Sequence, residues 1–284
     1  MRSGFATLVG RPNVGKSTLL NAIVGTKAAI VSDKPQTTRT QVRGVLTRRG
    51  PDGAPEAQLV VVDTPGVHKP RSRLGERCNA TARAALGGVD VVCLVLDATA
   101  PVGRGDRWVA AEVPPEAVCA VTKVDAATRA DVAAQLARAG ELGLAEYFPV
   151  SGRTGEGVPE LVDALLARLP EGPQYYPDDM VTDAPDAFWV AELVREQLLG
   201  AVRDELPHAI ACRVTEWDWP RVRCEVLVER ESQQGIVIGR GGSVLKAVGE
   251  AVRRQMPAGA YLELVARVDP GWSNRPAALD RLGY

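Results

Sequence analysis

An eight-residue run near the N-terminus has the composition and spacing of a phosphate-binding loop. Residues 10–17 read Gly-Arg-Pro-Asn-Val-Gly-Lys-Ser, the pattern G-x-x-x-x-G-K-S. The run follows a short apolar stretch at 5–9 and leads into a helical pattern, which is the context that such a loop requires. The two glycines let backbone N–H groups turn toward phosphate oxygens, and the helix N-terminus adds partial positive charge. The sequence therefore predicts a nucleotide site.

The side chains of this loop have distinct expected roles. Lys16 would bridge the β- and γ-phosphates, and the Ser17 hydroxyl would hold Mg²⁺. A Gly-rich turn can match the pattern by accident, but the flanking strand and helix favour a nucleotide site. The loop residues expected to contact the nucleotide are Gly10, Asn13, Val14, Gly15, Lys16, Ser17 and Thr18.

Two further segments are expected to reach the phosphates. Residues 63–66, Asp-Thr-Pro-Gly, end an apolar strand, so Asp63 can reach Mg²⁺ through water and the Gly66 N–H can reach the γ-phosphate. A plain β-turn would also use Pro and Gly, but it does not explain an Asp at the end of an apolar run. The loop at 36–40 can close on the γ-phosphate with Thr37 and Thr38, and Thr38 would complete the Mg²⁺ shell.

A third group of motifs would bind the base of the nucleotide. Each of them follows an apolar strand. These are Thr122-Lys123-Val124-Asp125 and Ser151-Gly152. The Asp125 carboxylate can accept from N1–H and N2–H₂ of guanine, donors that adenine lacks on that edge, while Lys123 can lay its stem along the base. The backbone N–H of Gly152 would donate to guanine O6. A site that pairs polar groups in this way rejects other bases, so the sequence predicts selectivity for GTP and GDP.

Composition excludes several other classes of protein. The 284 residues carry a net charge of −1 and are 45% hydrophobic, as in ordinary soluble proteins. No apolar run approaches the roughly 20 residues of a membrane span, and the first strand pattern begins too early for a signal peptide. Five cysteines have neither C-x-x-C spacing nor nearby histidines, which favours buried, reduced thiols in a cytoplasmic protein over a metal or redox site.

The elements that must position these motifs alternate between strand and helix. Strands are expected at 5–9, 42–47, 59–63, 89–97, 117–122 and 147–150, and helices at 16–24, 74–86, 106–111, 128–139 and 159–169. This alternation is typical of a doubly wound, mostly parallel α/β sheet. We therefore predict a P-loop GTP-binding domain over 1–170. The prolines and glycine at 170–177 predict a linker, which we assign to 171–186.

From residue 187 the pattern changes. Helices are expected at 187–202, at a short piece ending at Ile238 and at 243–255, and strands at 210–216, 222–229 and 261–268. Residues 239–242, Gly-Arg-Gly-Gly, form the G-x-x-G loop of a KH domain, which clamps the backbone of about four nucleotides. A lone G-x-x-G is often a plain turn, but the order of elements around it favours RNA binding. The prediction is a smaller α+β KH-type (type II) RNA-binding domain with a C-terminal tail over 187–284.

The expected RNA site is a basic stretch in an acidic region. The net charge is −4 over residues 175–284 and +3 over residues 1–174. Near the loop, however, four cations and one carboxylate give a local net charge of +3; they are Arg240, Lys246, Arg253, Arg254 and Glu250. Ile236, Val237 and Ile238 could floor a groove for unstacked bases. Trp217 and Trp219 are expected to pack in a turn rather than stack on bases. The residues expected to contact RNA are Ile236, Ile238, Gly239, Arg240, Gly241, Gly242, Ser243, Lys246 and Arg253.

With both halves considered, the chain resembles the translation-factor-related GTPases and, within them, the bacterial Era-type GTPases with a C-terminal KH domain. The resemblance extends over the whole chain and rests on the motifs at 10–17, 36–40, 63–66, 122–125 and 151–152. Two positions depart from the family pattern. Thr122 stands where the family usually has Asn, which would weaken guanine affinity while Asp125 keeps selectivity. Gly152 stands where the family usually has Ala, which would loosen the loop but keep the N–H.

The resemblance implies GTP hydrolysis with a slow intrinsic rate. Val67 stands where Ras-like switches carry a water-orienting Gln, and its side chain cannot orient water by hydrogen bonding. GTPases of this kind hold K⁺ with an Asn at the position of Asn13, and a cation there could stabilise charge in the transition state. The residues expected to act in hydrolysis are Asn13, Lys16, Thr38, Asp63 and Gly66, with Mg²⁺ held by Ser17, Thr38 and Asp63.

The resemblance also implies partners. It suggests a cytoplasmic monomer that binds small-subunit (16S) ribosomal RNA near its 3′ end and acts in assembly of the 30S subunit. The alternative is a passive RNA-binding assembly factor for which GTP is a structural ligand and hydrolysis is incidental. A membrane signalling role has less support, because the sequence has no lipidation motif or strongly basic amphipathic helix. At most we expect peripheral association with the inner face of the plasma membrane.

Overall fold

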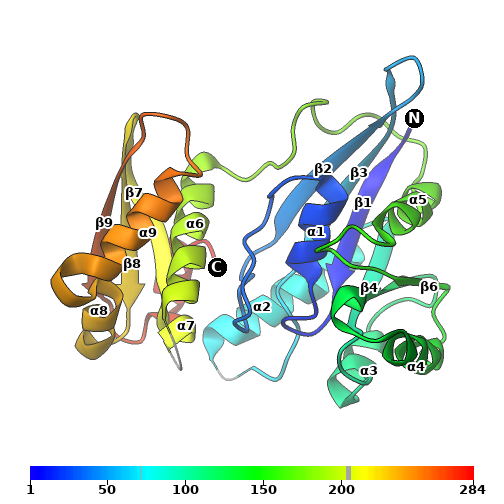
Figure 1. The fold of residues 1–284 in the computed structure, drawn as a ribbon, viewed down its shortest axis with the longest axis horizontal. Coiled ribbons are helices and arrows are strands. Elements are labelled where there is room, and N and C mark those ends of the chain that lie inside the picture. The colour runs from blue at the N-terminus through cyan, green and yellow to red at the C-terminus, as the bar shows by residue number, and fades with distance from the viewer. Residues whose placement is uncertain (71, 203–205) are drawn as a thin grey trace. The chain divides into compact units, whose positions relative to one another are not determined.

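The computed structural model describes residues 1–70, 72–202 and 206–284 (Figure 1). Contacts divide the chain into two compact units. Most of residues 1–183 form the first unit, and Ala184–Tyr284 form most of the second. The short segment Ser32–Thr37 groups with the second unit.

The first unit is built on a six-stranded sheet with the strand order β2-β3-β1-β4-β5-β6. Only β2 is antiparallel to its neighbour, and the remaining pairs are parallel. The strands are β1 (Arg2–Val9), β2 (Val42–Arg49), β3 (Pro55–Asp63), β4 (Val91–Asp97), β5 (Val118–Thr122) and β6 (Glu146–Pro149). The helices are α1 (Lys16–Val24), α2 (Arg73–Ala84), α3 (Arg104–Ala110), α4 (Arg129–Gly140) and α5 (Val158–Arg168). This confirms the predicted doubly wound, mostly parallel sheet.

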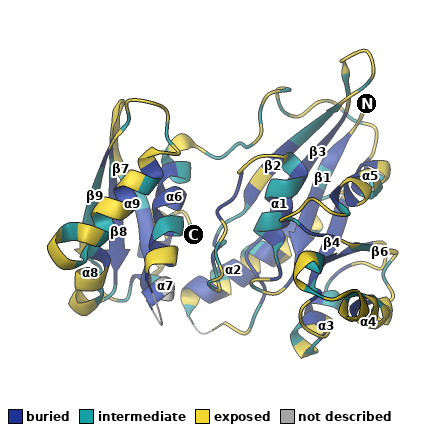
Figure 2. Ribbon diagram, viewed as in Figure 1, coloured by how far each residue is buried: buried dark blue, intermediate teal, exposed yellow. Residues whose placement is uncertain are grey.

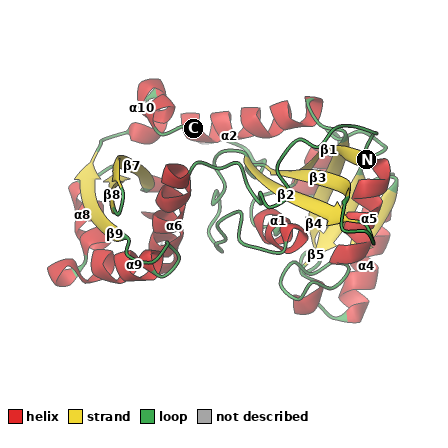
Figure 3. Ribbon diagram, turned by 90° about the horizontal axis from the view of Figure 1, so that it is seen from above, coloured by secondary structure: helices red, strands yellow, loops and turns green. Residues whose placement is uncertain are grey.

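Both faces of this sheet are covered, which explains why its central strands are apolar throughout. In β4, Val92, Leu94 and Leu96 belong to a hydrophobic cluster with residues of α2, α3 and α4. Side chains alternate along a strand, so Cys93 and Val95 face the other side, and both are fully buried. Helices α1 and α5 contact each other and strand β3. Figures 2 and 3 show the buried strands and the helices along the sheet.

The parallel strands bring several loops to one edge of the sheet. The loops after β1, β3, β5 and β6 all leave the carboxyl ends of parallel strands. Ligands of open α/β sheets bind at this edge. The motifs at 10–17, 63–66, 122–125 and 151–152 therefore meet there, although they are spread over more than half of the chain.

The second unit packs helices on a three-stranded sheet of order β7-β8-β9. Its elements are α6 (Asp186–Ala201), α7 (Leu206–Ala209), β7 (Ala211–Asp218), β8 (Arg221–Val228), α8 (Glu231–Ile238), α9 (Ser243–Arg253), β9 (Tyr261–Val268) and α10 (Pro276–Arg281). Strand β8 is antiparallel to β7 and parallel to β9. The core joins α6, α8 and α9 to the sheet, and the fully buried Trp272 donates to the Ala209 carbonyl at 3.0 Å. This matches the expected α+β KH-type order.

Two segments differ from what the sequence pattern indicates. Helix α10 begins with Pro276. It is not predicted from the sequence, because the segment is too short to show a helical period. Residues 171–183, within the predicted linker, group with the first unit. Ser3 donates from its N–H to the Pro170 carbonyl at 3.0 Å, and Gln58 bonds to the backbone of Tyr176. These hydrogen bonds, one between backbone groups and two made by the Gln58 side-chain amide, hold the segment along strands β1 and β3.

All five cysteines are buried, and none forms a disulfide with another described cysteine. Burial raises the pKa of the Cys93 thiol to about 12. Within the described part of the chain, no helix is long and apolar enough to cross a membrane.

Candidate functional site

The loop between β1 and α1 makes a turn that needs glycine at two points. Gly15 stands just before α1 with φ +97°, in the left-handed region that side chains avoid. A Cβ at Gly10 would lie 2.5 Å from the carbonyl oxygen of Val95 in β4. The loop is therefore pressed against the neighbouring strand and turns directly into the helix. This is the strand–loop–helix geometry that binds phosphate.

The Lys16 ammonium group is buried in this loop. Lys16 is only 6% exposed. Its Nζ donates to the carbonyl oxygens of Arg11 at 2.9 Å and Gly10 at 3.3 Å. Burial lowers the pKa of Lys16 to about 8, although the carboxylate of Asp63 opposes the shift. A charge that has lost its water gains more from a new anionic partner than an exposed one does.

Three oxygen-bearing side chains from three segments converge beside Lys16. The Ser17 hydroxyl donates to Asp63 Oδ2 at 2.5 Å and lies 2.9 Å from Thr38 Oγ1, which is itself 3.2 Å from the same carboxylate oxygen. Burial raises the pKa of Asp63, while Lys16 and the two hydroxyls oppose it. The other carboxylate oxygen, Oδ1, is buried without a hydrogen-bond partner among the described residues.

This donor set fits Mg²⁺. Hydroxyl and carboxylate oxygens are the ligands that Mg²⁺ uses, usually together with waters and phosphate oxygens. The unpartnered Asp63 Oδ1 is the atom that a metal-bound water could satisfy. The sequence placed Ser17, Thr38 and Asp63 at the metal, and the structure brings all three together.

The segment after β3 lies directly against the phosphate-binding loop. A Cβ at Gly66 would come within 2.5 Å of the Pro12 backbone, and the Val67 N–H donates to the Gly10 carbonyl at 3.1 Å. The Val67 side chain is 5% exposed and packs in the hydrophobic cluster shared by α2, α3 and α4. The position after Gly66 thus offers only a buried apolar side chain.

The expected base-reading residues lie together after β5 and β6. The Ser151 hydroxyl donates to Asp125 Oδ1 at 2.6 Å and accepts from the N–H groups of Thr154 at 3.0 Å and Arg153 at 3.2 Å. The Ser151 hydroxyl therefore holds its own loop together and orients the Asp125 carboxylate. A carboxylate fixed in this way is pre-organised to accept two hydrogen bonds from a base.

Asp97 is a member of this site that sequence reasoning missed. Its Oδ2 pairs with Lys123 Nζ at 2.5 Å. Burial acts to raise the pKa of Asp97, but its bonds to Lys123 and Thr99 outweigh this and hold the pKa below its ordinary value. Asp97 ends the apolar strand β4 just as Asp63 ends β3, so the same signal could have identified it.

Thr122, the last residue of β5, lies next to the phosphate-binding loop and strand β4. Its hydroxyl is turned inward, with the carbonyl oxygens of Val14 and Leu96 as acceptors, the latter at 2.9 Å. The residue is 2% exposed. Thr122 therefore ties strand β5 to the phosphate-binding loop and to strand β4. The predicted weakening of guanine affinity is a separate matter that stays a prediction.

Gly152 lies directly against helix α1, and the looser loop expected at this position stays a prediction. A Cβ at this position would lie 2.9 Å from the backbone of Thr18 in α1, closer than real Cβ contacts allow. The loop itself is closed by hydrogen bonds from the Ser151 N–H to the Glu156 carbonyl and from the Gly155 N–H to the Ser151 carbonyl. Gly152 permits close packing of this loop on α1.

A second missed residue holds the segment beside Thr38. Arg195, in helix α6 of the second unit, has a fully buried side chain that donates to both carboxylate oxygens of Glu192 and to the Thr37 carbonyl. Thr37 also donates its hydroxyl to the Lys34 carbonyl at 2.7 Å. No short motif marks Arg195, because its role depends on a partner 158 residues away.

The G-x-x-G loop of the second unit has the shape that its glycines predict. Gly239, Gly241 and Gly242 all have positive φ, at +75°, +59° and +79°. A Cβ at Gly239 would lie 2.6 Å from the Val244 side chain and 2.8 Å from its backbone nitrogen. The loop therefore joins α8 to α9 in a turn that other residues could not adopt without strain.

Most of the residues expected to contact RNA are accessible. Ile236 is 56% exposed, and Arg240, Ser243, Lys246 and Arg253 are also exposed. The interpretation of Val237 as groove floor is wrong, because this side chain is fully buried in the core of the second unit. The apolar surface next to the loop is provided by Ile236 and the half-buried Ile238.

Comparison with known proteins identifies the family. A family model described as "50S ribosome-binding GTPase" matches residues 5–123, and one described as "KH domain" matches residues 205–273. GTPase Era of Mycolicibacterium paratuberculosis is 45% identical over an alignment of 302 positions, which covers 100% of this chain and 99% of that protein. The chain belongs to the Era family of GTPases. It therefore binds and hydrolyses GTP and carries a KH domain.

Other Era proteins agree over the full length. GTPase Era of Mycobacterium tuberculosis is 44% identical, with 99% of this chain and 98% of that protein covered. A solved structure of an Aquifex aeolicus Era variant bound to GDP.AlF4⁻ aligns with a TM-score of 0.92 at 33% identity, and covers 100% of this chain and 99% of that one. Another, of Era with MgGDPNP and nucleotides 1506–1542 of 16S ribosomal RNA, has the same TM-score and coverage at 34% identity.

The buried Thr122 hydroxyl provides a test of how the Era-type site is held together. Thr122→Val keeps the shape but removes the single O–H that two buried carbonyl oxygens share, so the free energy of unfolding should fall by about 1–3 kcal/mol. Urea denaturation of the variant and the wild type measures this. Thr122→Ser, which keeps the hydroxyl, is the matched control and should lose less than the valine variant. Equal stability of Thr122→Val and wild type would contradict the proposed link.

Proposed function

We propose that this Era-type GTPase binds small-subunit (16S) ribosomal RNA near its 3′ end and acts in assembly of the 30S subunit. The observation that carries the proposal is the full-length likeness to the Era complex with MgGDPNP and nucleotides 1506–1542 of 16S ribosomal RNA. The positive-φ glycines of the loop at 239–242 and the exposed cations around it support the same reading. We expect a cytoplasmic monomer, with at most peripheral association with the inner face of the plasma membrane.

We also propose roles for the residues of the nucleotide site. Lys16 would contact the β- and γ-phosphates together with backbone groups of the phosphate-binding loop, and Gly66 would contact the γ-phosphate. Asp125, positioned by Ser151, would select guanine with Lys123 along its face. When bound through Ser17, Thr38 and Asp63, Mg²⁺ would neutralise phosphate charge during phosphoryl transfer. Gly10, Asn13, Val14, Gly15, Thr18, Thr37, Thr122 and Gly152 complete the proposed site.

The nucleotide state would control the grip on RNA through the segment at 36–40. Thr38 lies at the proposed metal, and its neighbour Thr37 is held by Arg195 within the second unit. A segment fixed at both points can respond to loss of the γ-phosphate by changing its order, as switch segments of GTPases do.

One observation is shared by the leading function and by the alternative, a passive RNA-binding factor with incidental hydrolysis. The buried Val67 offers no hydrogen bond to an attacking water, so intrinsic turnover should be slow. Purified 30S subunits distinguish the two functions. Under our proposal they raise the turnover of GTP by the wild type, whereas an unchanged rate would favour the passive factor.

The RNA target is tested by ultraviolet crosslinking in growing cells that express this chain. The wild type should crosslink to the 3′ end of small-subunit ribosomal RNA. A Gly241→Asp, Gly242→Asp double variant should lose these crosslinks, because two carboxylates would repel the RNA backbone at the loop. Its GTP hydrolysis, which depends on the other unit, shows whether the substitutions leave that unit intact, and its circular dichroism spectrum shows whether the second unit still folds. Dispersed crosslinks in the wild type, or unchanged crosslinks in the variant, would contradict the proposal.

A K⁺ ion at Asn13 would supply part of the charge stabilisation that Val67 cannot. Asn13 lies on the exposed side of the phosphate-binding loop with φ +63°. We expect hydrolysis to be faster in KCl than in NaCl at equal ionic strength, and Asn13→Ala to remove the difference while GTP binding persists. Single-turnover rates in the two salts measure this. Equal rates in both salts for the wild type would show that no K⁺ acts there.

A further inference from the structure

Two tryptophans of the second unit are partly exposed to solvent. Trp217 and Trp219, at the tip of the β7–β8 hairpin, are 41% and 46% exposed. Their rings stack with centroids 6.4 Å apart and an interplanar angle of 29°. They pack on each other in the turn, as expected, yet each residue stays exposed. Stacking stabilises the hairpin, yet it leaves large aromatic faces toward solvent.

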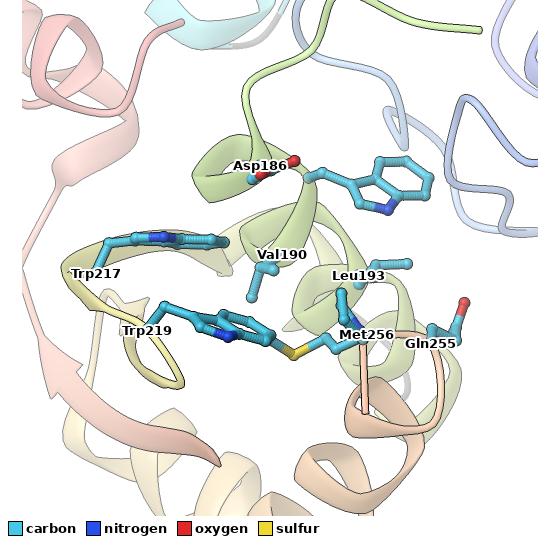
Figure 4. A pocket seen from close by; sticks show the side chains of 9 residues that line it. Asp186, Val190, Leu193, Trp217, Trp219, Gln255 and Met256 are labelled. Atoms are coloured by element: carbon cyan, nitrogen blue, oxygen red, sulfur yellow. The ribbon is translucent and has the colours of Figure 1, made fainter. Parts of the chain in front are cut away.

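These tryptophans form one wall of a pocket (Figure 4). The pocket holds about 310 Å³. It is otherwise lined by the start of helix α6, including the Asp186 carboxyl group and Trp189, and by the turn after α9, including Met256 and Pro257. Figure 4 shows the indoles one above the other, Val190 beside them and Met256 pointing at Trp219. A pocket of this size with flat aromatic walls suits a planar ring.

A second, polar hollow adjoins the aromatic pocket and shares Pro257 with it. It holds about 460 Å³ and is lined by Arg253, Arg254 and Glu250, together with residues 257–260. Among the described residues neither arginine pairs with a carboxylate, and Glu250 pairs with neither of them. Elsewhere in this unit arginines do pair, namely Arg213, Arg221, Arg223, Arg267, Arg275 and Arg281. Two unpaired guanidinium groups beside an aromatic pocket complement a phosphate next to a base.

The two hollows and the G-x-x-G loop lie at the two ends of helix α9. Helix α9 begins at Ser243, directly after that loop, and ends at Arg253. The loop and the aromatic pocket therefore lie at opposite ends of one helix, which is roughly 16 Å long. A KH loop engages only about four nucleotides, so a longer single strand has chain left over to reach the second position.

We propose that the aromatic pocket and the adjoining arginine hollow form a second RNA subsite, which takes one unpaired nucleotide of the strand bound at the G-x-x-G loop. The base stacks on Trp219, and its phosphate lies between Arg253 and Arg254. This rests on the proposed RNA-binding function and extends it. A cationic ligand, which aromatic pockets also bind, is disfavoured by the two arginines. Base stacking on tryptophan tolerates any sequence, so the subsite lengthens the footprint rather than adding sequence selectivity.

The test measures affinity by fluorescence anisotropy with two labelled RNAs. One is the strand of nucleotides 1506–1542 of 16S ribosomal RNA, and the other is a four-nucleotide piece of it that binds the wild type. Trp219→Ala should weaken binding of the long RNA about 5- to 150-fold, the usual effect of losing one stacked base, and leave the short RNA unchanged. Trp219→Phe, which keeps an aromatic face, should restore most of the affinity.

The matched control is Trp108→Ala. Trp108 is also 41% exposed, but it lies in the first unit with the Arg83 guanidinium 5.4 Å from its ring, and its loss should change neither affinity. The Arg253→Ala, Arg254→Ala double variant should reduce the slope of log affinity against log salt by about 1.4, the value for two phosphate contacts on a single strand.

Two results would overturn the subsite. The first is wild-type affinity of Trp219→Ala for the long RNA. The second is a change in sedimentation of the RNA-free protein on Trp219→Ala substitution, which would make the pocket a contact between two copies. Failure of the proposed function looks different, because then the Gly241→Asp, Gly242→Asp variant binds both RNAs as the wild type does.

Discussion

The buried ammonium group of Lys16 is the constraint on which the nucleotide site depends. It has exchanged water for the carbonyl oxygens of Gly10 and Arg11, and its opposite charge is the fully buried Asp63. Burial disfavours the charge on both groups, as their opposite pKa shifts show. Such a pair is stable only where the surrounding backbone is fixed. Gly10, pressed against the Val95 carbonyl, and Gly15, in the left-handed region, fix it.

The rest of the first unit holds partners around this charge. Parallel pairing of β1 with β3 and β4 brings Asp63 and the phosphate-binding loop to the same edge. The Thr122 hydroxyl connects β5 to that loop through the Val14 carbonyl, and Gly152 lets the loop after β6 approach α1. The base-reading and phosphate-binding halves of the site are thus linked by backbone contacts. A substitution in one half of the site is therefore expected to change the geometry of the other half.

Much of this site could be predicted from sequence, because its motifs combine local geometry with strand ends. Ser17, Thr38 and Asp63 meet as predicted, as do Asp125 and Ser151. The strand and helix pattern also gave the order of both units, since buried parallel strands read as apolar runs.

What could not be predicted depends on the direction of a side chain or on a distant partner. Whether Thr122 faces the base or the loop is decided by the Val14 and Leu96 carbonyl oxygens, which no spacing rule places. Arg195 finds Thr37 only in the folded chain. Trp217 and Trp219 occupy a turn, where aromatic residues usually pack, and only the structure shows their exposed faces.

The central claim is that Ser17, Thr38 and Asp63 form a Mg²⁺ site that serves the bound nucleotide. It is tested most directly by titrating Mg²⁺ against the affinity for a non-hydrolysable GTP analogue, in the wild type and in Asp63→Asn. We predict that Mg²⁺ tightens binding to the wild type, and that the variant loses this dependence while keeping wild-type affinity in EDTA. Undiminished Mg²⁺ dependence in Asp63→Asn would contradict the account.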